Sequence, residues 1–170
     1  MSVPASPSAA RRLRGLRTNS FAATVMLVVE FGLGVWVNLY ASLPAADQGA
    51  NITTGFARAI ANGPFGLSIH AIVGALLIIS ATTAVVRAAL VKRRVLIAVT
   101  SIGLLAVVFA ALSGAQFIGD SASDTSMSMT IGAAAAMICY ALILFITPSD
   151  APAEMAAKSR AATVIDTPST

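Results

Sequence analysis

The sequence predicts an all-α membrane protein, a transmembrane bundle of four antiparallel helices that run up-down-up-down. Composition is the first reason, because the 170 residues are 57% hydrophobic and 11% charged, whereas soluble domains are about a quarter charged. Length is the second reason, since the chain contains four apolar runs that each reach the roughly 18 residues of a membrane-spanning helix. The runs cover approximately residues 21–43, 66–90, 95–118 and 127–147.

The N-terminal segment, residues 1–20, combines Pro, Ser and Ala with several arginines. Because this composition cannot form a core, we expect a flexible or surface-lying basic arm, with the membrane domain covering residues 21–147. A basic segment before an apolar run also occurs in signal peptides. Their apolar region usually has about 7–15 residues, however, and the run here is longer and contains Glu30 and Asn38, which favours a retained first span.

The loop after the first span contains a four-residue periodicity. Trp36 lies near the end of that span, where an aromatic side chain suits the membrane interface. Ile52, Phe56 and Ile60 then recur every four residues, and Thr53 is available as a helix cap. Two interpretations stay open: a short amphipathic helix on the bilayer surface, or an ordinary loop.

The remaining spans are separated by short polar segments. Pro64 precedes the second span, as expected because proline is tolerated at a helix start. Residues 92–94 form a basic turn into the third span, and an acidic turn containing Asp124 leads to the fourth. The tail, residues 148–170, is small, polar and mixed in charge, so we expect a disordered cytoplasmic segment.

Basic residues predict the orientation. Of the 11 Lys and Arg residues, only Arg58 lies outside three segments: the N-terminal arm, residues 87–94 and the C-terminal tail. Four spans place these three segments on one membrane face, so both termini should be cytoplasmic in a multi-pass protein. The basic residues that give the net charge of +4 are then expected to contact the headgroups of the lipid bilayer, and we expect no nucleic-acid partner.

Two ionisable side chains inside the predicted spans, Glu30 and His70, are candidates for a function. Such a group costs about 2.5–3.5 kcal/mol at mid-helix and usually faces the bundle interior. Glu30, Gly34 and Asn38 share one helical face. Glu30 is either the proton-carrying carboxyl of a relay or a neutral group that joins the first two helices. In the second case its expected partners are hydroxyl residues: Ser80, Thr82 and Thr83.

His70 is the one histidine of the chain and should lie near the outer end of the second span. Its expected depth matches Asn38 and Gln116, so a hydrogen bond to either residue is one interpretation. Glu30 should lie about 9 Å deeper at 1.5 Å per residue, and we expect no direct Glu30–His70 pair. The predicted polar intramembrane cluster is Glu30, Asn38, His70 and Gln116.

Haem is the cofactor that the sequence leaves open. His70 could act as an axial ligand, and Gly74 one turn away leaves space for a flat group or for a close helix. A second ligand would be Met127, Met129 or His70 of another subunit. Otherwise no cofactor is expected, because the sequence lacks a phosphate-binding loop and metal-ligand spacing, and no catalytic residue is predicted.

Three segments carry a resemblance to known membrane proteins: NLYASLP, SIHAIVGALLIISATTAVVRA and LSGAQFIGD. Together they resemble small four-span integral membrane proteins of actinobacteria, over roughly residues 20–147. The resemblance implies a bacterial plasma membrane. The place of His70 is also similar to one half of haem A synthase or of a b561-type bundle. Those families carry further helix histidines, and this chain departs from them with Ser128 at the matching position of the fourth span.

These observations predict a small, non-enzymatic plasma-membrane protein that binds a partner protein or a lipophilic small molecule. We expect it to act as a homo-oligomer or within a larger membrane complex. One alternative is a redox protein that holds haem b or a quinone near the outer leaflet through His70. A second alternative is an oligomeric transport or proton-relay element that uses Glu30.

Overall fold

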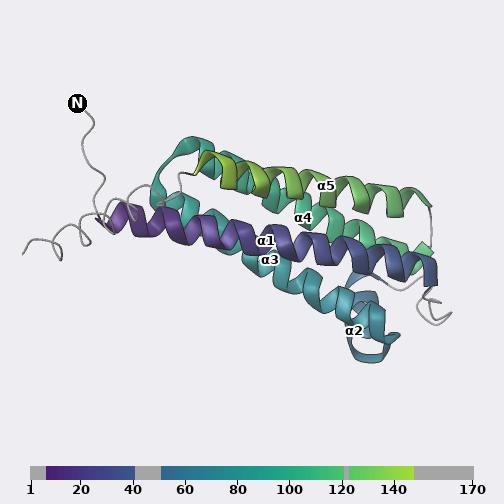
Figure 1. The fold of residues 1–170 in the computed structure, drawn as a ribbon. Coiled ribbons are helices and arrows are strands. Elements are labelled where there is room, and N and C mark those ends of the chain that lie inside the picture. The colour runs from purple at the N-terminus through teal and green to yellow at the C-terminus, as the bar shows by residue number, and fades with distance from the viewer. Residues whose placement is uncertain (1–6, 41–50, 121–122, 148–170) are drawn as a thin grey trace, which may run out of the picture.

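The computed structural model describes residues 7–40, 51–120 and 123–147, and this part of the chain is helical apart from short turns. The described residues form four long helices and one short helix. In Figure 1 the long helices lie side by side and alternate in direction, with the short helix at one end. This arrangement confirms the predicted all-α, up-down-up-down bundle. The helices are α1 (Pro7–Tyr40), α2 (Ile52–Asn62), α3 (Phe65–Val91), α4 (Arg94–Asp120) and α5 (Ser123–Ile146).

Each long helix is long and apolar enough to cross a membrane. The 27 residues of α3 extend about 40 Å at 1.5 Å per residue, more than the roughly 30 Å of a hydrocarbon core. Large apolar side chains such as Ile79, Leu105 and Phe145 are exposed on the outer surface of the bundle. An apolar exterior of this kind fits contact with lipid, since soluble monomers rarely expose extensive apolar patches.

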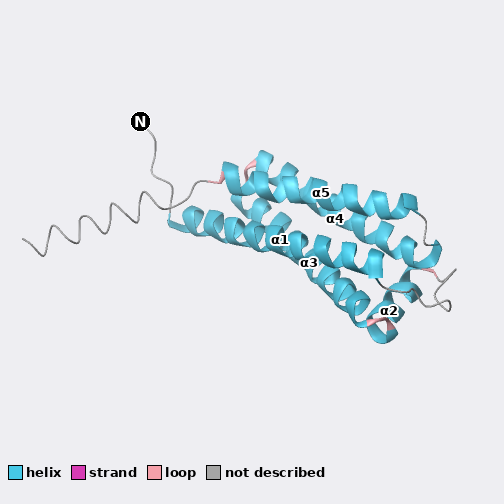
Figure 2. Cartoon of the chain, turned by 45° about the vertical axis from the view of Figure 1, so that its right-hand side comes forward, coloured by secondary structure: helices cyan, strands magenta, loops and turns pink. Residues whose placement is uncertain are grey.

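The bundle has two different ends. We call the end where α1 begins and α3 and α5 finish the basic end, because it carries Arg12, Arg17 and Arg87. The opposite end, where α2 packs against α3 and α4, is the α2 end. In Figures 1 and 2, α3 diverges from α5 toward the α2 end. The predictions for residues 1–6 and for the tail, 148–170, lie outside the described residues.

Helix α1 begins earlier than the sequence analysis expected. Residues 7–20, assigned there to an arm outside the membrane domain, are part of α1, and Leu16 and Ser20 within them are fully buried. The segment is rich in Ala, Leu and Arg, which are strong helix formers, and Pro7 is suited to the first helical turn. The low apolar content concealed a contact face at helical spacing: Leu13, Leu16 and Ser20.

Arginines at the basic end bind backbone carbonyls of neighbouring helices. Arg12 Nη1 donates to the Leu90 carbonyl at 3.0 Å, and Arg17 Nη1 donates to the Thr147 carbonyl at 3.1 Å. These carbonyls belong to the ends of α3 and α5, where intrahelical donors are missing and the helix dipole favours a cation. Arg87 Nη1 completes the arrangement by donating to the Gly15 carbonyl at 2.7 Å.

These contacts fix the register between α1 and α3. The sequence-based spans placed Phe21 level with Leu90, but Arg12 occupies that level instead. The shift is more than two turns at about 3.6 residues per turn. At the opposite end the Trp36 ring packs directly on Gly66, and the same register is kept.

Helix α2 confirms the helical interpretation of the segment after the first span. The Asn51 side chain caps it by accepting from the Thr54 amide at 2.8 Å, a role that the sequence analysis had offered to threonine. Ala59 is fully buried, Phe56 is partly buried, and Ser68 of α3 donates its hydroxyl to the Ala59 carbonyl at 2.9 Å. The small side chain of Ala59 lets α2 approach the bundle closely.

Candidate functional site

A cavity of about 220 Å³ lies within the bundle toward the α2 end. All four long helices and Phe56 of α2 line it, and most of the lining side chains are apolar. Small residues create the space, among them Gly34, Gly74, Gly114 and Ala133. The cavity lies at the end of the bundle toward which α3 diverges from α5 (Figure 2).

Glu30 and His70 form an acid–base pair in the cavity wall. His70 Nδ1 lies 3.0 Å from Glu30 Oε1, and the side chains are 19% and 14% exposed, respectively. The two atoms are within ion-pair distance but do not meet the angular geometry of a hydrogen bond. Glycines make the pair possible, because a β-carbon at Gly74 would lie 3.0 Å from Glu30 Oε1, and one at Gly34 would lie 3.3 Å from His70 Cε1.

The expectation that Glu30 and His70 would not meet is therefore wrong. It rested on depths counted from the first apolar residue, and the early start of α1 moves Glu30 toward His70 by more than two turns. Two of the three hydroxyls expected to bind Glu30 are engaged elsewhere, and the third residue, Ser80, contacts Asn19 instead. The Ser80 carbonyl accepts from the Asn19 amide at 3.0 Å, and the Thr82 and Thr83 hydroxyls donate to carbonyls of their own helix.

One oxygen of the pair lacks a partner. Glu30 Oε2 is buried and makes no hydrogen bond within the described part of the chain. Buried polar atoms normally have a partner, and leaving one without costs about 1–3 kcal/mol. Because Glu30 also lines the cavity, a carboxyl oxygen without a partner lies beside a mostly apolar space.

The other two residues of the predicted polar cluster differ in their positions. Asn38 lines the cavity at its exposed side, whereas Gln116 is exposed and does not line it. Three members of the predicted cluster thus surround one cavity. The sequence analysis missed Ser126 and Thr130 of α5, which also line it. Their four-residue spacing places both on one helical face and could have suggested a role.

Met129 and Met127 differ in the same way. Met129 lines the cavity, and its sulfur lies 3.2 Å from the position of a β-carbon on Gly114. Met127 is an exposed side chain outside the lining. Of the two methionines that the haem hypothesis named, only Met129 shares a space with His70.

The volume of the cavity limits what it can hold. A cavity of about 150 Å³ accommodates benzene, and ligand sites for drug-sized molecules have about 300–1,000 Å³. At about 220 Å³, the space fits one substituted ring. A porphyrin, which contains four pyrrole rings in one plane, exceeds this volume. The described residues also contain no group of three or more His, Cys, Asp or Glu that could hold a metal ion.

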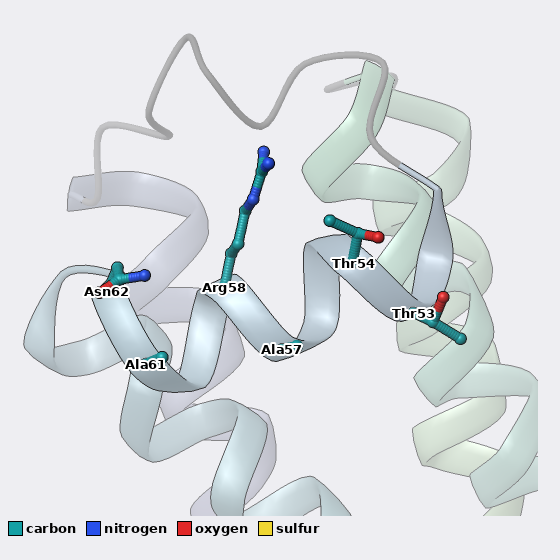
Figure 3. Close-up of a pocket in the computed structure, with 6 residues that line it drawn as sticks. All are labelled: Thr53, Thr54, Ala57, Arg58, Ala61 and Asn62. Atoms are coloured by element: carbon teal, nitrogen blue, oxygen red, sulfur yellow. The ribbon is translucent and has the colours of Figure 1, made fainter.

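A second, larger hollow of about 430 Å³ runs along α2. Figure 3 shows its lining, and Arg58 extends away from the helix there. Its lining residues are Thr53, Thr54, Ala57, Arg58, Ala61 and Asn62. Because all of them belong to one helix, no described element forms an opposite wall. The cavity at Glu30 and His70, which is lined by all four long helices, is therefore the better candidate for a specific site.

Comparison with known proteins found no protein family, no curated protein and no solved structure that matches this chain.

Proposed function

We propose that this chain is a multi-pass protein of the bacterial plasma membrane that binds one small lipophilic molecule inside its helical bundle, at the Glu30–His70 pair. The observation that carries the proposal is the unpartnered Glu30 Oε2 in the wall of an apolar cavity. Small-molecule sites typically combine an apolar lining with a few placed polar groups. Here the apolar walls would hold the body of the ligand, and Glu30 would fix its polar end.

The proposed orientation places both termini in the cytoplasm. Exposed cations gather at the basic end, including Arg11, Arg93 and Arg94. Cytoplasmic loops of membrane proteins are enriched in Lys and Arg, and anionic headgroups attract such side chains. The cavity, which lies toward the α2 end, would then be in the outer half of the membrane. Reporter fusions at residue 170 and after Asn62 should be active on opposite membrane faces.

A proton relay is the second candidate function, because a carboxyl and an imidazole 3.0 Å apart can exchange a proton. The residues between the Glu30–His70 pair and the basic end do not support a proton relay. Leu27 and Leu77 are buried there, followed by Ala81 and Ala84, and all belong to an apolar core. A relay through the bundle would need polar groups or water in this layer.

Ligand binding can be tested by thermal unfolding in mild detergent with added 4-ethylphenol as a probe. A ligand that binds only the folded state stabilises it, by about 2.7 kcal/mol at 100 times its Kd. We expect a saturable rise in Tm for the native protein. Ala133→Leu, which fills the cavity, should abolish the rise, and Ala134→Leu, on the exposed face of the same helix, should keep it. Equal shifts in all three proteins would reflect the micelle and contradict the proposal.

A further inference from the structure

Among the described residues, the exposed part of the cavity lining belongs to α1 and α5. Its exposed lining residues on α1 include Phe31 at 40%, Val35 at 45% and Leu39 at 65%, and α5 contributes the exposed Thr130. Every lining residue on α3 and α4 is buried or half-buried. The opening therefore lies between α1 and α5. We call it the α1–α5 window, bounded by Phe31, Val35, Asn38, Leu39 and Thr130.

The rim of the window is mostly apolar and belongs to a candidate membrane span. Phe31 and Leu39 both belong to the membrane-spanning part of α1 and are about 12 Å apart along the helix at 1.5 Å per residue. Their side chains are large and apolar. A molecule that passes through this window moves between the cavity and the lipid without crossing the polar ends of the bundle.

The inner end of the cavity selects the chemistry of the ligand. Glu30 Oε2 is an acceptor without a donor, so a matching ligand must donate a hydrogen bond. A ligand carboxylate would bring a second acceptor against it. A pure hydrocarbon would leave the oxygen unsatisfied, which is unfavourable in a buried site.

Resting on the proposed function, we infer that the ligand is a single-chain amphiphile with a neutral, hydroxyl-bearing ring. The hydroxyl donates to Glu30 Oε2, the ring fills the cavity, and the alkyl chain leaves through the α1–α5 window into the bilayer. The volume of about 220 Å³ accounts for one ring, and the apolar rim of the window accounts for the chain.

Two probes that differ only at the donor test the head group: 4-octylphenol and its methyl ether, 4-octylanisole. A hydrogen bond to a carboxylate corresponds to about a tenfold or greater preference for the phenol. We expect this preference in the native protein, with saturable binding of both probes. In Glu30→Met, which keeps the length of the side chain, we expect the preference to fall to about one. Equal affinities in the native protein would overturn the assignment of the head group.

The exit of the chain is tested with 4-octylphenol that carries a diazirine at the end of its chain. After illumination in lipid nanodiscs, mass spectrometry should locate the label on α1 near Val35 and on α5 near Thr130. Labels confined to α3 or α4 would overturn the window. If no probe binds saturably, the proposed function itself fails. Saturable binding with equal affinities or with labels elsewhere contradicts only the inference on ligand class and route.

Discussion

The two halves of the bundle contain the same four helices but differ in what faces their glycines. In the half toward the basic end, Gly103 lies against Tyr140, since a β-carbon there would come within 3.2 Å of Tyr140 Cζ. The large ring fills the space that the glycine opens. In the half toward the α2 end, Gly34, Gly74 and Gly114 border the cavity together. Beside Gly103 an aromatic ring leaves no space, whereas beside Gly34, Gly74 and Gly114 the facing side chains leave a cavity.

The strongest test of the closed half is Tyr140→Ala. Tyr140 is fully buried, and truncation of a large aromatic side chain costs about 3–5 kcal/mol in soluble cores. We expect about 3 kcal/mol here, because burial from lipid lacks most of the hydrophobic contribution. The measurement is the free energy of unfolding in mixed micelles.

Tyr140→Phe is the matched control for that truncation. The Tyr140 hydroxyl is buried and makes no hydrogen bond within the described residues, so its removal should be neutral or slightly stabilising. A loss as large as that of Tyr140→Ala would show that the hydroxyl, and not the ring, holds the closed half together.

The contact between Trp36 and Gly66 provides the next largest effect. A β-carbon at Gly66 would collide with the Trp36 ring, and overpacking typically costs about 1–3 kcal/mol. Because Trp36 is the only tryptophan, its fluorescence should shift in Gly66→Ala. Gly32→Ala should leave fluorescence unchanged and gain stability, since no atom lies within 4 Å of the added carbon and alanine favours the helix.

A smaller effect is expected at the basic end. Arg17→Ala removes the donor to the Thr147 carbonyl, and we expect a loss of about 1–2 kcal/mol in the free energy of unfolding. Arg11→Ala, at an exposed position on the same helix, should stay within about 0.5 kcal/mol. Equal losses would mean that the effect comes from net charge and not from the contact with α5.

The smallest change in stability is expected at Glu30. Glu30→Leu removes a misaligned pair with His70 and also removes the unpartnered Oε2, and these effects oppose each other. We expect thermal stability in detergent within about 1 kcal/mol of the native protein, while the response to 4-ethylphenol is lost. A loss of about 3 kcal/mol or more would show that Glu30 joins the helices and is not a binding group.

The fold could be predicted from the sequence because its determinants are local. Apolar runs long enough to cross a membrane and the short segments between them define four helices. The register of α1 could not be predicted in this way. It depends on Leu16 and Ser20, which are buried in a segment of low apolar content, and on Arg12 reaching the Leu90 carbonyl.

The candidate site could be predicted only in part, for the same reason. Helical spacing correctly placed Glu30, Gly34 and Asn38 on one face, and all three line the cavity. Spacing alone does not tell which residues of another helix lie opposite that face. The Glu30–His70 pair and the outward position of Gln116 therefore required the structure.

Helix α1 is continuous, so its two ends are connected by one helix. Figure 1 shows one unbroken helix, which the contacts of Arg12, Arg17 and Arg87 hold to α3 and α5 at the basic end. Its other end forms one side of the α1–α5 window. The residues of α1 that bound the window, together with Arg12 and Arg17 at the basic end, thus belong to one continuous helix. A displacement of α1 at the window would therefore change the distances between these arginines and the carbonyls that they bind on α3 and α5.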